Sequence, residues 1–218
     1  MKPLRITLLC SSAEHPVMPT LREWADKYKN IHHITILQHA KDAQGGDILF
    51  LISCSEIIKK NTRQKYDHIL VIHASDLPHG RGWSPHIWQI LEGKSQITVS
   101  LLEAADKVDA GDIWHKISVP LQGHELYDEI NQKLFTAELE LMDFAIKNCH
   151  TITPLPQNHT KATYYPKRTP ADSEVEPHKP LMEHFNLLRT VDPHRFPAFF
   201  KAKGHTYLLK ITKQQTEN

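Results

Sequence analysis

Short apolar runs alternate with amphipathic stretches over the first 120 residues. Six runs have the length of a strand, and they lie at residues 4–10, 32–38, 47–53, 68–74, 96–104 and 112–121. Apolar residues at helical spacing predict helices at 18–30, 55–64 and 84–93. Strands that are apolar throughout and separated by helices are typical of a parallel sheet covered on both faces. We therefore expect an α/β fold with a central, mostly parallel sheet.

The pattern changes after a long amphipathic helix predicted at 124–147. Residues 151–180 hold six prolines and little periodicity, which indicates an ordered linker over the surface. A last helix is predicted at 179–190, followed by a hairpin that turns at Lys203-Gly204. We expect a catalytic domain at 1–150, then a linker and a small C-terminal α+β subdomain at 151–218.

Composition excludes several classes of protein. The formal charge is +1, which argues against a dedicated nucleic-acid surface. The three cysteines are widely spaced, and the 16 histidines show no metal-ligand spacing, so we expect neither a disulfide framework nor a metal site. The first apolar run is too short for a signal peptide, and no run is long enough to span a membrane. We expect a cytoplasmic protein.

One histidine lies at the carboxyl end of a predicted strand, a position that often carries functional residues. His73 closes the apolar run Ile69–Ile72, and ligands of open parallel sheets bind beyond the carboxyl ends of the strands. Asp109 lies in the tight turn Asp109-Ala110-Gly111-Asp112, between two further strands. On its own, His73 is explained as well by a structural role, and the turn by solvation. If the two side chains meet, the pair suits proton transfer near neutral pH.

The stretches "IHASDLPHGRGWSP" and "DAGD", 36 residues apart, together resemble the hydrolase-like formyltransferases that use 10-formyltetrahydrofolate. The resemblance is clearest over residues 45–150, and it implies a Rossmann-like formyltransferase fold. The matching residues are His73, Ser75, Leu77, Pro78, Arg81, Gly82, Asp109, Gly111 and Asp112.

The resemblance implies attack of a substrate amine on the formyl carbon of 10-formyltetrahydrofolate. His73 then stabilises the oxyanion and helps to move protons, while Asp109 holds His73 and favours its charged form. Asp112 is expected to cap the loop. The chain departs from the family at Val71, where the family has an asparagine that donates to the oxyanion. Losing one such donor costs roughly 10²–10³ in rate.

The resemblance also implies contacts to the pterin ring. The main chain of Ser55 and Ile57 is expected to face it from one side, and the loop around Asp106 from the other. Ser55 is also a plausible N-cap for the predicted helix at 55–64. Cys54 has no identifiable base beside it and is not expected to act as a nucleophile.

Three further residues are candidates for the amine substrate. Ser11 and Ser12 follow the first strand and are expected to contact phosphate. Arg81 is expected either to contact the substrate or to order its own loop.

The C-terminal part narrows the expected amine. Residues 168–173, 186–189 and 197–200 resemble the tail of bacterial sugar N-formyltransferases. Glycinamide ribonucleotide enzymes end after the long helix, and methionyl-tRNA enzymes carry a longer, basic C-terminal domain. The expected substrate is a nucleotide-linked amino sugar, and the motif is most like pseudaminic-acid-type enzymes that act on a UDP-linked 4-amino-4,6-dideoxy sugar.

Three alternatives and the oligomeric state stay open. One is a catalytically weak relative that binds folate or a partner, motivated by Val71. Another is an enzyme like methionyl-tRNA formyltransferase, and the third is a metal-dependent deformylase or hydrolase. A homodimer is also left open by the resemblance.

Overall fold

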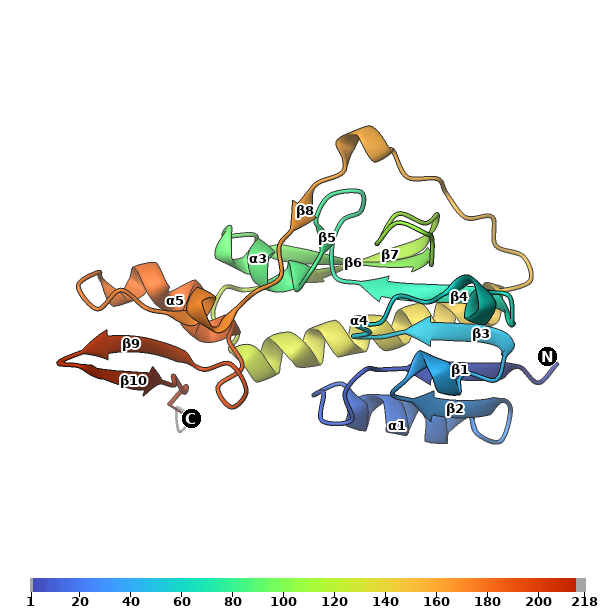
Figure 1. The fold of residues 1–218 in the computed structure, drawn as a ribbon, viewed down its shortest axis with the longest axis horizontal. Helices are drawn as coiled ribbons and strands as arrows, with labels where there is room; N and C mark the ends of the chain where they lie inside the picture. Colours follow the sequence, from blue (N-terminus) through green and yellow to red (C-terminus); the bar gives the residue numbers. More distant parts are fainter. Residues whose placement is uncertain (1, 215–218) are drawn as a thin grey trace.

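The computed structural model describes residues 2–214. At its centre is a six-stranded sheet in the order β2-β1-β3-β4-β6-β7 (Figure 1). Each strand matches one of the six apolar runs within two residues. The strands are β1 (Arg5–Leu9), β2 (His33–Leu37), β3 (Gly46–Leu51), β4 (Tyr66–His73), β6 (Gln96–Glu103) and β7 (Ile113–Pro120).

The sheet is mostly parallel, as predicted. Strands β1 to β4 pair in parallel, whereas β6 is antiparallel to both of its neighbours, β4 and β7. Because β1, β3 and β4 are adjacent and run in one direction, their carboxyl ends lie at the same edge. The loops that follow these three strands therefore meet there.

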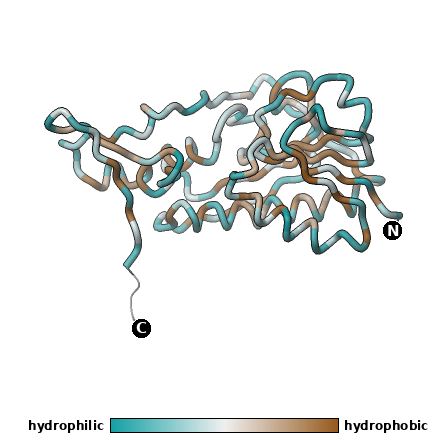
Figure 2. The backbone as a smooth tube through the Cα atoms, turned by 60° about the horizontal axis from the view of Figure 1, so that its bottom comes forward, coloured by the Kyte–Doolittle hydropathy of each residue, from teal (hydrophilic) through white to brown (hydrophobic). Residues whose placement is uncertain are grey.

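One face of the sheet carries the larger hydrophobic core. Helices α1 (Met18–Tyr28) and α4 (Tyr127–Asn148) pack against it, as their predicted apolar stripes require. From β4, Leu70 and Ile72 point into this core. Figure 2 shows the most hydrophobic segments concentrated in the strands of the sheet. Burial on this side fixes which residues of β4 face the opposite way, because side chains alternate along a strand.

The opposite face is covered more thinly, and here one sequence prediction is wrong. The predicted helix at 55–64 is reduced to α2 (Lys60–Arg63), so Ser55 is not an N-cap. Residues 55–59 instead run outside regular structure, where the Glu56 carboxylate accepts the N–H of Ala40, at the start of η1 (Ala40–Asp42), at 3.2 Å. This tertiary contact overrides local helix propensity.

The helix predicted at 84–93 is α3 (Pro85–Leu91). It begins after Ser84, which has a left-handed backbone, and the chain leaves it through Gly93 at φ +80°. A glycine suits this conformation because it has no side chain to clash.

The proline-rich linker is ordered and contains short elements that the sequence pattern did not predict. These are η2 (His159–Lys161), β8 (Tyr164–Tyr165) and η3 (Pro170–Ser173). Strand β8 pairs in parallel with β5 (Arg81–Gly82), a two-residue strand in the loop after His73. The linker thus lies directly against the loop that carries the Arg-Gly motif.

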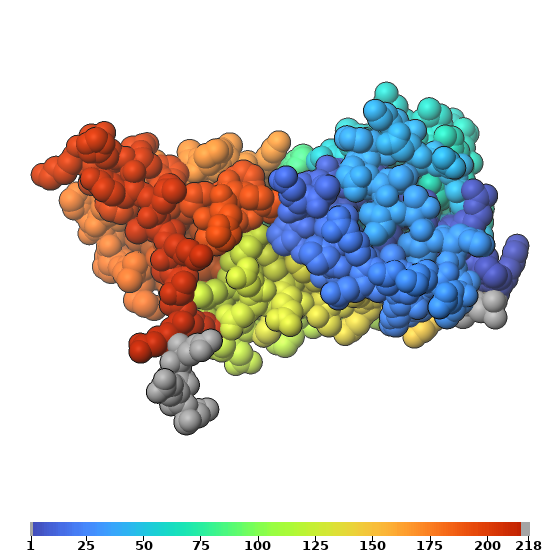
Figure 3. Space-filling model, turned by 90° about the horizontal axis from the view of Figure 1, so that it is seen from below, coloured from blue at the N-terminus to red at the C-terminus, as the bar shows by residue number. Residues whose placement is uncertain are grey.

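The C-terminal residues form a helix and a hairpin with a small core of their own. Helix α5 (Leu181–Thr190) precedes β9 (Ala198–Ala202) and β10 (His205–Leu209), which turn at Lys203-Gly204 as predicted. Val175, Leu188, Val191 and Ala198 form this core. Figure 3 shows the C-terminal part of the chain, in orange and red, beside the first turns of α4.

Within residues 2–214, no helix has both the length and the apolar character needed to cross a bilayer.

Candidate active site

His73 and Asp109 meet at the carboxyl end of β4, as the sequence predicts. The Nδ1 atom of His73 lies 3.6 Å from Oδ2 of Asp109, and both side chains are less than one-tenth exposed. Asp109 belongs to the loop 104–112 between β6 and β7. Since β6 is antiparallel to β4, it ends at Glu103 opposite Leu70, so the loop must turn back along β4 to reach His73.

Both ring nitrogens of His73 face oxygen atoms. The Nε2 atom lies 2.9 Å from the main-chain carbonyl oxygen of Gly80, which only accepts hydrogen bonds, so Nε2 carries a proton. The Nδ1 atom faces a carboxylate of Asp109, which when ionised is also only an acceptor. The Nε2–H of His73 thus donates to Gly80, and the Asp109 carboxylate lies close enough to Nδ1 to attract positive charge on the ring.

The backbone of the Asp109 turn is closely constrained. Asp109 has a left-handed backbone at φ +52°, and its Oδ2 atom accepts the N–H of Gly82 at 2.9 Å. At Gly111 a Cβ atom would lie 1.8 Å from the carbonyl oxygen of Glu103, so only glycine fits. The Asp112 carbonyl, rather than its exposed carboxylate, closes the loop by accepting the N–H of Glu103 at 2.9 Å.

Arg81 lies beside the site but is buried. It is 2% exposed, and its guanidinium donates to Gln157 Oε1 at 2.6 Å and to Tyr164 Oη at 3.2 Å, with His159 Nδ1 at 2.9 Å. These partners come from the linker, so the side chain ties its own loop to that segment. A direct contact of Arg81 with the substrate stays a prediction.

Ser11 and Ser55 are brought together by the adjacent ends of β1 and β3. The Oγ atom of Ser11 accepts the N–H of Ser55 at 2.9 Å. Ser12 lies next to it and accepts the N–H of Glu14 at 3.3 Å. The candidate phosphate contacts and the candidate pterin contacts are therefore continuous along this edge.

Ile57 has the exposure expected of a ligand contact. Its side chain is 80% exposed although it is apolar, and among the described residues its main chain takes part in no hydrogen bond. Cys54 beside it is half-buried, and burial raises the pKa of its thiol, which opposes a nucleophilic role.

Asp106 is exposed, and its carboxylate forms an ion pair with Arg63 of α2. This ion pair links the loop 104–112 to the segment after β3. The loop predicted to face the pterin is thus joined to α2, which follows the segment that contains Ser55 and Ile57.

Val71 lies on the same face of β4 as His73, two residues earlier. It is half-buried and packs against a small cluster with Leu51 and Ile69. The Val71 side chain has no hydrogen-bond donor. The asparagine expected from the resemblance is therefore missing on the face of β4 that carries His73.

Two histidines that the sequence analysis did not select also lie near the site. His86, the second residue of α3, is close enough to His15, His73 and Arg168 for their charges to act on it. Burial is the main cause that lowers the pKa of His86 to about 4. The pKa of His15 is also lowered to about 4, by burial first and then by the positive charge of Arg195. Both rings are therefore neutral at pH 7. No sequence signal distinguished them among 16 histidines.

No metal centre accompanies the pair. Across residues 2–214, His, Cys, Asp and Glu side chains form no group of three that would hold a metal ion.

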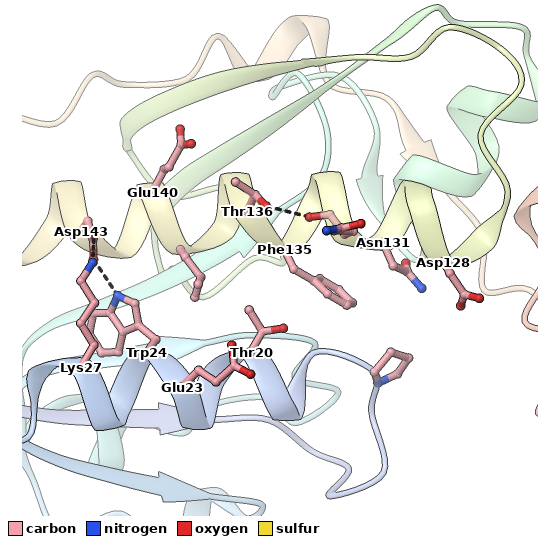
Figure 4. Close-up of a pocket in the computed structure, with 13 residues that line it drawn as sticks. Thr20, Glu23, Trp24, Lys27, Asp128, Asn131, Phe135, Thr136, Glu140 and Asp143 are labelled. Carbon is pink, nitrogen blue, oxygen red and sulfur yellow. Dashed lines mark hydrogen bonds and ion pairs between the residues drawn. The ribbon is translucent and has the colours of Figure 1, made fainter. Parts of the chain in front are cut away.

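A large surface groove lies elsewhere, between α1 and α4 (Figure 4). Its volume is about 660 Å³, and Asp143 crosses it to accept from Trp24 Nε1 at 2.6 Å and from Lys27 at 3.2 Å. It contains none of the residues predicted for the active site.

Comparison with known proteins gives a family and a fold. Residues 11–146 match the sequence profile of the family described as Formyl transferase. A methionyl-tRNA formyltransferase of Bacillus velezensis is 31% identical over 151 residues, which are 67% of this chain and 47% of the relative. The chain therefore spans about half the length of this curated relative.

Solved structures share the fold over nearly the whole chain. A methionyl-tRNA formyltransferase from Clostridium thermocellum has a TM-score of 0.83 at 20% identity, covering 97% of this chain and 94% of that one. HypX from Aquifex aeolicus, in complex with tetrahydrofolic acid, has a TM-score of 0.81 at 21% identity, covering 95% and 37%. A sugar N-formyltransferase from a Shewanella species has a TM-score of 0.73 at 14% identity, covering 98% and 99%.

Proposed function

The chain belongs to the formyl transferase family, and we propose that it transfers a formyl group from 10-formyltetrahydrofolate to the amine of a nucleotide-linked sugar. The observation that carries this proposal is the buried His73–Asp109 pair at the edge where β1, β3 and β4 end. An imidazole held by a carboxylate supplies the charge and the proton transfer that acyl transfer needs.

The residues beside the pair fit a folate. Exposed, apolar Ile57 with its unpaired main chain offers a surface for a flat heterocycle, and half-exposed Val71 lies beside His73. Val108, in the loop 104–112, is another exposed apolar residue. The structure of HypX with tetrahydrofolic acid supports a folate in this fold.

In this proposal His73 acts on the formyl oxygen and Asp109 keeps the imidazole charged and oriented. Because Nε2 bonds to the carbonyl of Gly80, His73 reaches a substrate only when that contact is exchanged for one to the ligand. The folate supplies the one-carbon group when bound. Ser11 and Ser12 contact the phosphates of the amine substrate, and Arg81 holds its own loop against the linker.

For the amine we propose a UDP-linked 4-amino-4,6-dideoxy sugar. Support comes from the motifs in residues 168–200, and from a sugar N-formyltransferase and a 4-N formyltransferase whose folds each cover 98% of this chain. The net charge of +1 disfavours a surface for tRNA. The prediction of a homodimer in the cytoplasm stands with this proposal and is untested.

A second candidate is the methionyl group of initiator tRNA. The 31% identity to the Bacillus velezensis enzyme and the fold shared with the Clostridium enzyme favour it. A weak, folate-binding relative is the third, because Val71 removes a donor.

One experiment separates the three. The purified protein is incubated with 10-formyltetrahydrofolate and a panel of UDP- and dTDP-linked 3-amino and 4-amino sugars, with methionyl-tRNA in parallel, and formamides are detected by mass spectrometry. Formylation of a UDP-4-amino sugar is expected. Product from methionyl-tRNA alone would overturn the sugar assignment. Folate binding with no product from any amine would favour the weak relative.

A further inference from the structure

The segment 155–165 follows the part of the chain that matches the family profile, yet it contacts both motifs of the site. Leu155 exchanges two main-chain hydrogen bonds of 2.8 Å with Ile113, next to the Asp109 turn. Thr163 accepts the N–H of Arg81 at 2.9 Å through its carbonyl and the N–H of Gly80 at 2.8 Å through its Oγ1. The segment is thus built into the active site.

At the centre of these contacts is Gln157, which is buried. Its Nε2 atom donates to the carbonyl oxygens of Asp109 at 3.0 Å and of Gly111 at 2.7 Å. Its Oε1 atom accepts from the guanidinium of Arg81 at 2.6 Å. The Gln157 amide therefore connects the Asp109–Asp112 turn to the loop that carries Arg81.

The backbone conformation of the Asp109 turn needs stabilising contacts of this kind. Asp109 has a left-handed backbone, and Gly111 presses against the end of β6, so the turn is held in a conformation that an unrestrained chain rarely adopts. The Asp109 carboxylate reaches His73 only from this conformation, because Oδ2 must also meet the N–H of Gly82.

We propose that Gln157 is a positioning residue for Asp109, holding the carboxylate against His73 through the two carbonyls of the turn. It touches no reacting atom, and its effect rests on the proposed function. Arg81 supports this role, because its guanidinium donates to Oε1 of Gln157. The amide is then oriented with Nε2, and not Oε1, toward the turn.

Two variants separate the contacts. Gln157→Met has a similar shape but removes both the donor and the acceptor. Gln157→Glu keeps the acceptor for Arg81 and removes the donors to the turn. Gln132→Met, on the exposed side of α4, is the matched control.

Kinetics and a double-mutant cycle give the main test. With the amino sugar that proves reactive, both Gln157 variants are expected to lower kcat about 10- to 100-fold with little change in KM, because small displacements of a catalytic group are costly. In an Asp109→Asn background, Gln157→Met is expected to cause no further loss. Wild-type kcat in both variants, or a full additional loss in that background, would overturn the proposal.

A measurement without substrate keeps this test independent of the proposed function. Ring resonances of His73 in labelled protein are expected to shift in both Gln157 variants, while those of His86 stay unchanged. The melting temperature identifies a variant that fails to fold. If wild type formylates no amine, the proposed function fails, and unchanged His73 resonances would then still overturn the role of Gln157.

Discussion

The Nδ1 atom of His73 lies 3.6 Å from Oδ2 of Asp109, and both side chains are buried. The two residues are 36 positions apart, and they meet because the loop after β6 turns back along β4. Nothing else in the described residues pairs a buried imidazole with a buried carboxylate so closely. The pair is therefore the first target for experiment.

His73→Ala is expected to lower kcat for formyl transfer at least 10³-fold, because it removes the group that stabilises the oxyanion and transfers protons. Asp109→Asn is expected to lower it about 10²-fold, since the imidazole loses its opposite charge. Steady-state kinetics with 10-formyltetrahydrofolate and the reactive amine measures both. His79→Ala, in the exposed part of the same loop, is the control. Near-wild-type kcat in His73→Ala would contradict the assigned site.

Val71→Asn is expected to raise kcat, by up to about 10²-fold, if the rate is limited by a missing oxyanion donor. Val71 is half-buried beside His73, so an amide can point to the site and keep contact with solvent. Single-turnover rates and melting temperature separate chemistry from folding. Val71→Leu, which adds volume but no donor, is the control. A folded Val71→Asn protein with unchanged or lower kcat would show that another group already serves the oxyanion.

The two neutral histidines are expected to weaken the fold in acid. The pKa values of His15 and His86 fall to about 4, from an ordinary value of 6.5, through burial and nearby positive charge. Between pH 4 and pH 6.5 the unfolded chain binds more protons than the folded protein does. The contribution to stability is therefore complete above pH 6.5 and is lost as the pH falls toward 4. Each histidine contributes about 2 kcal/mol of this loss between pH 7 and pH 5.

Urea denaturation at several pH values tests this, with histidine resonances followed by NMR. His15→Gln and His86→Gln are expected to flatten the pH dependence, whereas His178→Gln, on the exposed surface, leaves it unchanged. The groups that face His15 are Arg195 and Asp192, and those that face His86 are His15, His73 and Arg168. Titration of either ring near pH 6.5 would refute the prediction.

Glu138 of α4 is expected to act in the opposite direction. Burial raises the pKa of its carboxyl to about 8, and its Oε2 atom has no hydrogen-bond partner among residues 2–214. Between pH 4.5 and pH 8 the folded protein binds the extra proton, so stability is lost as the pH rises through this range. Glu138→Gln is expected to increase the free energy of unfolding at pH 8 by about 1–3 kcal/mol.

The matched control is Glu140→Gln, which changes an exposed carboxylate on the same helix. Denaturation at pH 5 and pH 8 measures both variants. If Glu138→Gln and wild type lose stability equally over this range, the buried carboxyl does not carry the pH dependence.

The hydrophobic pattern predicted the elements of the sheet well. All six predicted strands exist, and α4 lies within three residues of its predicted ends, because continuous burial leaves a strong signal. The pattern failed at residues 55–64, where a long-range contact of Glu56 and the Ser11–Ser55 bond hold the chain extended. Such contacts leave no periodic trace in the sequence.

The site was predicted in part. His73 and Asp109 were recognised because their motifs have a fixed spacing, and the structure brings them together. Arg81 was expected in the loop, but its burial was not predicted, and the sequence analysis did not select Gln157, His15 or His86, which lie close to this pair or its loop. Their significance depends on which segments pack together, and single residues of common types do not reveal that.

The sequence by itself determined which segments become strands and that a histidine stands at the end of β4. Those properties follow from short, continuous apolar runs that end at polar residues. Only the tertiary structure decided that β6 runs antiparallel, that its loop returns to His73, and that the proline-rich segment binds the Asp109 turn. The physical reason is that these arrangements are set by hydrogen bonds and packing between residues far apart in the chain.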